Sequence, residues 1–167
     1  ETEPTWHSGV LSEKPQIVPP SSCFLMRLPL QIEAIIFRRV NGKIHYLLIK
    51  RTPERGGFWQ PITGGLEEGE TETEALKREV REETGIKNIV RKLENIHYFE
   101  FSNPHLIKEY AFGVEVLANE KIVLDRKEHS EFRWCDFQEA LKLLEWKENK
   151  LALEKLHQTL SGQKSTR

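Results

Sequence analysis

The chain has 167 residues and a formal net charge of −1, with 25 Lys and Arg residues against 26 Asp and Glu residues. This length suits a single domain with one hydrophobic core, and the balanced charge gives no electrostatic reason to expect a DNA polymer or a membrane as partner. Two cysteines, no apolar run of membrane-spanning length and no visible secretory signal exclude a disulfide framework and favour a cytoplasmic location.

The N-terminal half is predicted to begin with an irregular arm and to continue with a hairpin. Residues 1–30 form the expected arm, since they contain five prolines, although residues 24–30 could pack as a strand. Residues 32–39 and 43–51 read as strands joined by Val40-Asn41-Gly42, because Asn-Gly is a strong hairpin signal. The following loop and a short aromatic stretch end at Gly64-Gly65, where a tight turn is expected.

A helix is predicted over residues 71–84, because this segment is rich in helix formers and contains neither Pro nor Gly. Gly85 should end the helix in a left-handed conformation, as a glycine after the last helical residue commonly does. Leu76 and Val80 fall on one arc of the helix, so they should face a hydrophobic core.

The same helix gathers three carboxylates. Glu79 and Glu83 lie one turn apart with Glu82 beside them, and like charges at this spacing cost a bare helix about 0.2–0.5 kcal/mol per pair. A hard divalent cation would reverse the sign of that cost, because Mg²⁺ takes oxygen ligands. The alternative is a solvated acidic face paired with neighbouring cations, for which Arg78 and Glu82 have suitable spacing.

The C-terminal half is predicted to contain further strands and two helices. Strand patterns cover residues 89–101, 106–118, 121–124 and 130–134. Asp136 is a candidate N-cap for a helix at 137–146. A final amphipathic helix is expected at 149–160, followed by a C-terminal tail at 163–167; its apolar set is Leu151, Leu153, Leu156 and Leu160. This order of elements predicts an α+β fold or a mixed-sheet sandwich.

Residues 64–86 follow a fixed pattern, G-x5-E-x7-R-E-U-x-E-E-x-G-U, where U is aliphatic. The residues that fill it are Gly64, Glu70, Arg78, Glu79, Val80, Glu82, Glu83, Gly85 and Ile86. The chain therefore resembles the Nudix hydrolases, from about residue 32 to residue 160. The resemblance implies a Nudix domain at 31–162, an α/β/α sandwich with a mixed β-sheet between helices, and hydrolysis of a nucleoside diphosphate linked to another group.

The resemblance also implies roles for single residues. Mg²⁺, or Mn²⁺ as a substitute, would be bound by Glu79, Glu82, Glu83 and the carbonyl oxygen of Thr63. Arg78 would orient the carboxylates of the signature, and Glu70 would brace the loop and helix through Arg78. Gly64 and Gly85 would serve the backbone conformation.

The expected general base is Glu128. Glu128-His129 followed by Trp134 resembles the base-bearing loop of bacterial dihydroneopterin triphosphate pyrophosphatases. Two alternatives stay open: Glu128 is a surface residue of a charged run, or Glu82 or Glu83 serves as the base.

Substrate contacts are expected just before the signature. Phe58 and Trp59 could stack on a base or pterin ring, or they could be core aromatics. Because Gln60 alternates with Trp59, one of the two should face the pocket and the other the core. Arg51 and Arg55 could pair with phosphates, although Arg55 could equally be a solvated loop charge.

Outside these sets, Glu109 is either a further metal ligand or a solvated strand carboxylate, with the second favoured. The histidines His97, His105 and His129 show no zinc-like spacing, and none is assigned a metal role.

Three functions remain open. The favoured one is Mg²⁺-dependent hydrolysis of a nucleoside triphosphate such as dATP, or of dihydroneopterin triphosphate, with release of pyrophosphate. The second is hydrolysis of diadenosine tetraphosphate or another Nudix substrate, since the Phe58–Gln60 stretch also resembles asymmetric diadenosine tetraphosphate hydrolases. The third is a non-catalytic Nudix-fold nucleotide-binding module. The expected partner is a small nucleotide or pterin triphosphate, and the resemblance leaves a homodimer open.

Overall fold

The computed structural model describes residues 28–162. The secondary structure elements are β1 (Leu30–Val40), β2 (Lys43–Arg51), the 3₁₀ turn η1 (Pro53–Arg55), β3 (Trp59–Gln60), β4 (Ile62–Gly65), α1 (Glu72–Thr84), β5 (Arg91–Ser102), β6 (Leu106–Glu115), β7 (His129–Cys135), α2 (Phe137–Leu143) and α3 (Lys147–Gly162). The expected arm and tail lie almost entirely outside the described residues. Among the described helices, none is long and apolar enough to cross a membrane.

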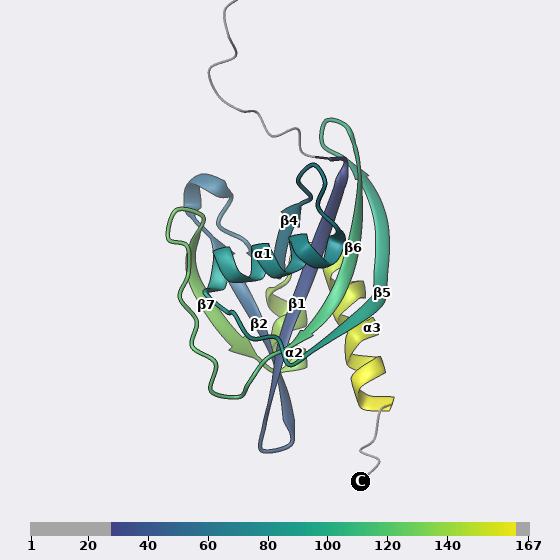
Figure 1. Cartoon of the computed structure of the whole chain (residues 1–167). Coiled ribbons are helices and arrows are strands. Elements are labelled where there is room, and N and C mark those ends of the chain that lie inside the picture. The colour runs from purple at the N-terminus through teal and green to yellow at the C-terminus, as the bar shows by residue number, and fades with distance from the viewer. Residues whose placement is uncertain (1–27, 163–167) are drawn as a thin grey trace, which may run out of the picture.

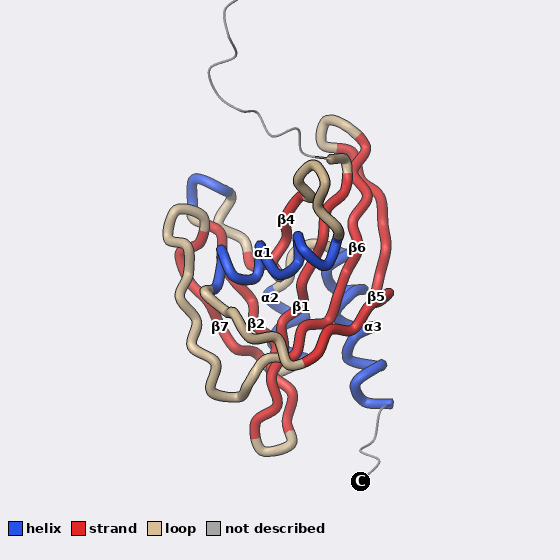
Figure 2. The backbone as a smooth tube through the Cα atoms, in the orientation of Figure 1, coloured by secondary structure: helices blue, strands red, loops and turns tan. Residues whose placement is uncertain are grey.

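One mixed sheet forms the centre of the molecule (Figure 2). The strands follow the spatial order β3-β2-β1-β6-β5, while β4 also pairs with β1 and β7 with β2. The β1–β6 pair is parallel and the other pairs are antiparallel. Helix α1 covers one face, and α2 and α3 cover the other (Figure 1). The predicted sandwich of helices around a mixed sheet is confirmed.

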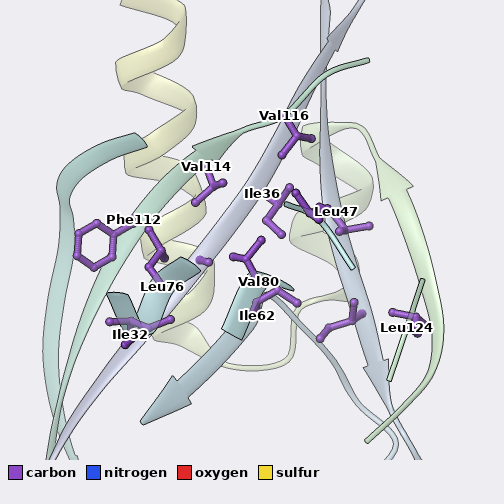
Figure 3. Close-up of a cluster of buried hydrophobic side chains, with 14 of the residues drawn as sticks. Ile32, Ile36, Leu47, Ile62, Leu76, Val80, Phe112, Val114, Val116 and Leu124 are labelled. Atoms are coloured by element: carbon purple, nitrogen blue, oxygen red, sulfur yellow. The ribbon is translucent and has the colours of Figure 1, made fainter. Parts of the chain in front are cut away.

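Each face of the sheet buries its own hydrophobic cluster. Figure 3 shows the cluster under α1, where Leu76 and Val80 are fully buried against Ile32 and Ile36 of β1, as predicted. The cluster under α3 includes Leu153, Leu156 and Leu160. Leu151 was expected in this set but is only half-buried. Ala152 is buried instead, because residues 149, 152, 153, 156 and 160 follow the i, i+3, i+4, i+7 spacing of one helical face.

Local sequence signals account for both ends of α1 and for the first hairpin. Thr71 and Glu74 form a reciprocal capping box at the start of α1, and Gly85 ends the helix with φ of 74°. Asn41 and Gly42 both have positive φ in the two-residue turn between β1 and β2. Such a turn matches the twist of the flanking strands.

Four details of the predicted elements were wrong. Residues 121–124 form no strand, because the backbone amides of Val123 and Asp125 donate to carbonyls at the end of α1, those of Thr84 and Glu83. Helix α2 stops at Leu143, three residues early, since Leu144 turns extended and bridges to Trp59 of β3. Helix α3 begins at Lys147 rather than 149, and β1 begins at Leu30, inside the expected arm.

Candidate active site

Arg78 of α1 ties the loop before the helix to the helix itself. Its guanidinium group donates to both carboxylate oxygens of Glu70, at 2.8 and 2.9 Å, and to the carbonyl oxygen of Gly65 at 2.9 Å. It also donates to Glu79 at 2.6 Å and to Glu82 at 3.4 Å. These hydrogen bonds lower the pKa of the Glu70 carboxyl group. Arg78 therefore holds the carboxylates of Glu70 and Glu79 in place, as a residue that orients them must do.

Gly64 lets the β4 backbone pack directly on the Glu79 carboxylate. A Cβ atom at position 64 would lie 2.0 Å from Cδ of Glu79 and 2.2 Å from its Oε1. Glu79 is 8% exposed, so its carboxylate sits between the helix and the Thr63–Gly64 backbone. A glycine is needed here for close approach of the chain to a side chain.

The carboxylate of Glu83, in α1, contacts the start of β7, which lies much later in the sequence. Nε2 of His129 lies 3.0 Å from Oε2 of Glu83, and the His129 side chain is fully buried. One ligand atom from each of Glu83, Glu128 and His129 lies within 4.8 Å of the others. The sequence analysis assigned no role to His129, because its contact partner lies in α1, 46 positions away. The structure thus brings Glu128 to the signature helix.

Glu82 differs from the other two carboxylates of the helix. Its side chain is 53% exposed and its contact is with Arg78 at 3.4 Å. Glu79 and Glu83 are both more than nine-tenths buried. The structure therefore brings two of the three predicted carboxylate ligands together in a sheltered site and leaves Glu82 at its solvent side.

Burial sets the protonation of Glu79. Desolvation raises its pKa to about 7, assisted by the charges of Glu83 and Glu82 and opposed by the hydrogen bond from Arg78. A carboxyl group whose pKa is higher in the folded protein than in the unfolded chain stabilises the fold at low pH. That contribution is lost as the pH rises from the ordinary value of 4.5 through about 7.

We expect the metal-free protein to lose more thermal stability between about pH 5 and pH 8 than its Glu79→Gln variant does. The neutral amide keeps the shape of the side chain and removes its titration. Comparing the two proteins removes the contributions of other titrating groups to the change in Tm. One of these is His157, whose pKa is lowered by burial, so that its contribution to stability rises with pH. The measurement is Tm by circular dichroism in EDTA at both pH values. Equal losses of Tm in the two proteins would contradict the assigned pKa shift.

The donors at this site suit a hard divalent cation. The nearly buried carboxylate of Glu79 lies against Gly64, and the equally buried carboxylate of Glu83 has Glu128 within reach. Mg²⁺ and Mn²⁺ prefer carboxylate and carbonyl oxygens. A bound cation would also relieve the repulsion between Glu79 and Glu83, which helps to raise the pKa of Glu79. The residues present therefore fit a divalent metal site.

A pocket of about 640 Å³ opens beside β4. Its walls include the aromatic side chains of Phe58, Phe99, Phe101 and Trp146. Arg51, at the end of β2, and Thr63, in β4, also line it. Thr63 directly precedes Gly64, which packs on Glu79. The pocket and the carboxylate site therefore adjoin at two consecutive residues of β4, Thr63 and Gly64.

The residues predicted to contact substrate divide into two groups. Arg51, Phe58 and Gln60 line the pocket, whereas Trp59 packs on the hydrophobic cluster under α3 and carries Arg133 over its ring at 5.1 Å. This is the alternation expected for Trp59 and Gln60, with Gln60 on the pocket side. Arg55 does not line the pocket; it forms an ion pair with Glu128 at 3.5 Å.

The sequence analysis missed a buried polar cluster in the pocket wall. Glu109 is 2% exposed, so the expectation of a solvated carboxylate was wrong. It accepts from Gln31 at 2.7 Å. The neighbouring Glu33 carboxyl group accepts from Asn149 at 3.1 Å, and burial and the charge of Glu109 raise its pKa. One signal in the sequence is Glu33, a carboxylate inside the apolar strand β1, where both faces are buried.

Comparisons with known proteins agree with the geometry. The NUDIX domain model matches residues 29–156. Dihydroneopterin triphosphate diphosphatase from Escherichia coli K12 is 30% identical over 141 residues, covering 75% of this chain and 90% of that protein. Asymmetrical bis(5'-nucleosyl)-tetraphosphatase from Mus musculus is 32% identical over 137 residues, covering 75% and 91%.

Two further similarities bear on the extent of the match. A protein named octanoyltransferase from Myxococcus xanthus is 42% identical over 101 residues, which are 59% of this chain and only 28% of that protein. The crystal structure of a NUDIX hydrolase from Listeria monocytogenes has a TM-score of 0.70 and 28% identity, and covers 81% of this chain and 96% of that one. With a family model that matches most of its length, a fold shared with solved members and the complete signature around α1, this chain belongs to the Nudix family and is a hydrolase of pyrophosphate bonds.

Proposed function

We propose that the protein hydrolyses a nucleoside triphosphate, such as dATP, or a pterin triphosphate, such as dihydroneopterin triphosphate, with Mg²⁺ and with release of pyrophosphate. The observation that carries this proposal is the adjacency of two sites along β4, where Thr63 lines an aromatic pocket and the next residue, Gly64, packs on the Glu79 carboxylate. A ring in the pocket would place a chain of phosphates at the carboxylates. The similarity to dihydroneopterin triphosphate diphosphatase supports the same substrate class.

The metal would be held by Glu79, Glu83 and the Thr63 carbonyl oxygen, and when bound it neutralises charge that develops on the phosphate oxygens. Arg78 fixes Glu79 through their 2.6 Å hydrogen bond, so this carboxylate is oriented before substrate arrives. Arg51, which lines the pocket, would pair with a phosphate oxygen. These groups position the α-phosphorus for attack by water, after which pyrophosphate leaves.

Glu128 would take the proton from the attacking water. Its carboxylate lies within 4.8 Å of the Glu83 carboxylate and pairs with Arg55 at 3.5 Å. Glu128 lies on a loop outside the signature and is not one of the proposed metal ligands. It can therefore accept a proton without the metal losing a ligand.

We expect Glu128→Gln to lower kcat by about 10²–10⁴-fold with little change in KM, because the amide cannot accept the proton but keeps the shape of the side chain. Steady-state kinetics would show this split. Glu131→Gln serves as the control, since Glu131 is exposed on β7, the strand that directly follows Glu128. A wild-type kcat in the Glu128 variant would assign the base to another residue.

The second candidate is hydrolysis of a dinucleoside tetraphosphate, which the similarity to the mouse bis(5'-nucleosyl)-tetraphosphatase favours. The two candidates differ in their products. The deoxynucleoside triphosphates, dihydroneopterin triphosphate and diadenosine tetraphosphate should be incubated separately with the protein and Mg²⁺, and the products separated by ion-exchange chromatography. Pyrophosphate and a monophosphate from a triphosphate support the first candidate. Turnover of the tetraphosphate alone, to mono- and triphosphate products, would replace it with the second.

A further inference from the structure

Two polar atoms at the pocket have no partner. Oε1 of Glu109 and Nε2 of Gln60 make no hydrogen bond among the described residues, although both side chains are more than nine-tenths buried. Both residues line the pocket. A buried polar group without a partner is costly, which is why such groups in folded proteins commonly mark a place where a ligand or water binds. The atoms offer one acceptor and one donor.

The Glu109 carboxyl group is held in a fixed position. Its Oε2 accepts from Gln31 at 2.7 Å. The Glu33 carboxyl group is its neighbour, and Oε2 of Glu33 also has no partner among the described residues. Two neighbouring buried carboxyl groups do not both carry a charge, and Glu33 is the better place for a proton, because burial and then the charge of Glu109 raise its pKa well above the ordinary value. Glu109 is therefore the member of the pair that ionises first, with a pKa that burial raises to about 7. Of the two carboxyl groups, only Glu109 lines the pocket.

The rest of the pocket suits a flat aromatic ring. Phe58 and Trp146 meet edge to face with ring centroids 5.7 Å apart, and Phe99 and Phe101 stack along β5 at the same distance. All four line the pocket. Aromatic walls bind a heterocycle through its faces with little regard to its identity. Discrimination between rings must then come from the polar groups that meet the ring edge.

We propose that Glu109 makes this pocket selective for a 2-amino-4-oxo-pyrimidine edge, the arrangement of N–H, amino group and carbonyl that guanine and pterins share. This inference rests on the proposed function and narrows its substrate class. The carboxylate accepts from the ring N–H and the adjacent amino group. The unpartnered amide of Gln60 serves as donor to a ring carbonyl.

Other nucleobase edges fit a fixed carboxylate less well. A carboxylate accepts two parallel N–H bonds, and such charge-assisted pairs are about twice as strong as neutral ones. Adenine and cytosine place a ring nitrogen lone pair beside the amino group, so that lone pair would face a carboxylate oxygen. Thymine has a single N–H between two carbonyls. A site built to bond donor groups rejects analogues that lack them, because its own buried polar atom then stays unpaired.

The test compares dGTP with dATP in wild-type protein and in Glu109→Gln. The glutamine offers one acceptor and one donor, which suits adenine better than guanine. We expect the wild type to favour dGTP in kcat/KM by at least about tenfold, and the variant to lower that ratio by at least about tenfold. Activity towards dATP in the variant shows that it is folded. Glu145→Gln is the matched control, as Glu145 is exposed between α2 and α3.

A binding measurement separates this inference from the proposed function. Guanosine and adenosine lack phosphates, so calorimetric titration of each in EDTA reports on the ring pocket alone. Preferential binding of guanosine that Glu109→Gln removes supports the inference, whether or not triphosphates are hydrolysed. An unchanged preference between the two nucleosides in the variant would overturn it. Triphosphates left intact by the wild type in Mg²⁺ would instead count against the proposed function.

Discussion

Replacing Glu79 by glutamine is expected to lower kcat by about 10³-fold or more and to leave the fold intact. The carboxylate is nearly buried, lies against the Thr63–Gly64 backbone and is fixed by Arg78. The amide keeps these dimensions but removes the charge that would hold the cation, and stabilisation of charge by a metal contributes several kcal/mol to a transition state. Steady-state release of pyrophosphate in saturating Mg²⁺ measures the loss.

Glu72→Gln is the matched control for this variant, because Glu72 lies on the same helix with an exposed side chain. It should keep wild-type kcat. Circular dichroism should show the same helix and strand content in wild type and both variants. Substantial residual activity in Glu79→Gln would remove Glu79 from the metal site.

Gly64→Ala is expected to lower kcat/KM by about 10²-fold or more while shifting Tm only slightly. The added methyl group would lie 2.0 Å from Cδ of Glu79, and the atoms it meets belong to a side chain rather than to the backbone. The carboxylate can therefore move aside without unfolding the sheet, but it leaves the position in which Arg78 holds it. A misplacement of about 1 Å in a catalytic group is enough for a 10²-fold loss.

Gly162→Ala provides the control for this substitution, since no atom lies within 4 Å of the added methyl group. Activity and Tm should both be unchanged there. If Gly64→Ala retained full activity, the close packing of β4 on Glu79 would have no part in catalysis. If it unfolded the protein, the steric conflict would fall on the backbone instead of on the carboxylate.

The sequence predicted the signature helix and its surroundings well because the signals there are local. Gly85, Thr71 and the Leu76–Val80 arc each act within a few residues, through a left-handed cap, a capping interaction and helical periodicity. The Asn41–Gly42 turn is local in the same sense. Two strands at 43–51 and 30–40 were consequently found to within a few residues of their ends.

Contacts between distant segments were beyond the reach of such signals. His129 meets Glu83 across 46 positions, and Asn149 meets Glu33 across 116. Periodicity says that Glu109 sits in a strand, but only the parallel pairing of β6 with β1 places it beside Gln31. The strand predicted at 121–124 is absent for a related reason. The backbone amide of Val123 donates to a carbonyl at the end of α1, and no local sequence pattern predicts that contact.

Titration of the metal-free protein with Mn²⁺, followed by the electron paramagnetic resonance signal of the free ion, tests the central claim that the α1 carboxylates form a divalent metal centre. The wild type should bind Mn²⁺ and reduce the free signal, and Mg²⁺ should compete for the same site. A variant with both Glu79→Gln and Glu83→Gln, folded by circular dichroism, should leave the signal close to that of the ion in buffer. Equal binding by the wild type and this double variant would contradict the claim and place the metal elsewhere in the protein.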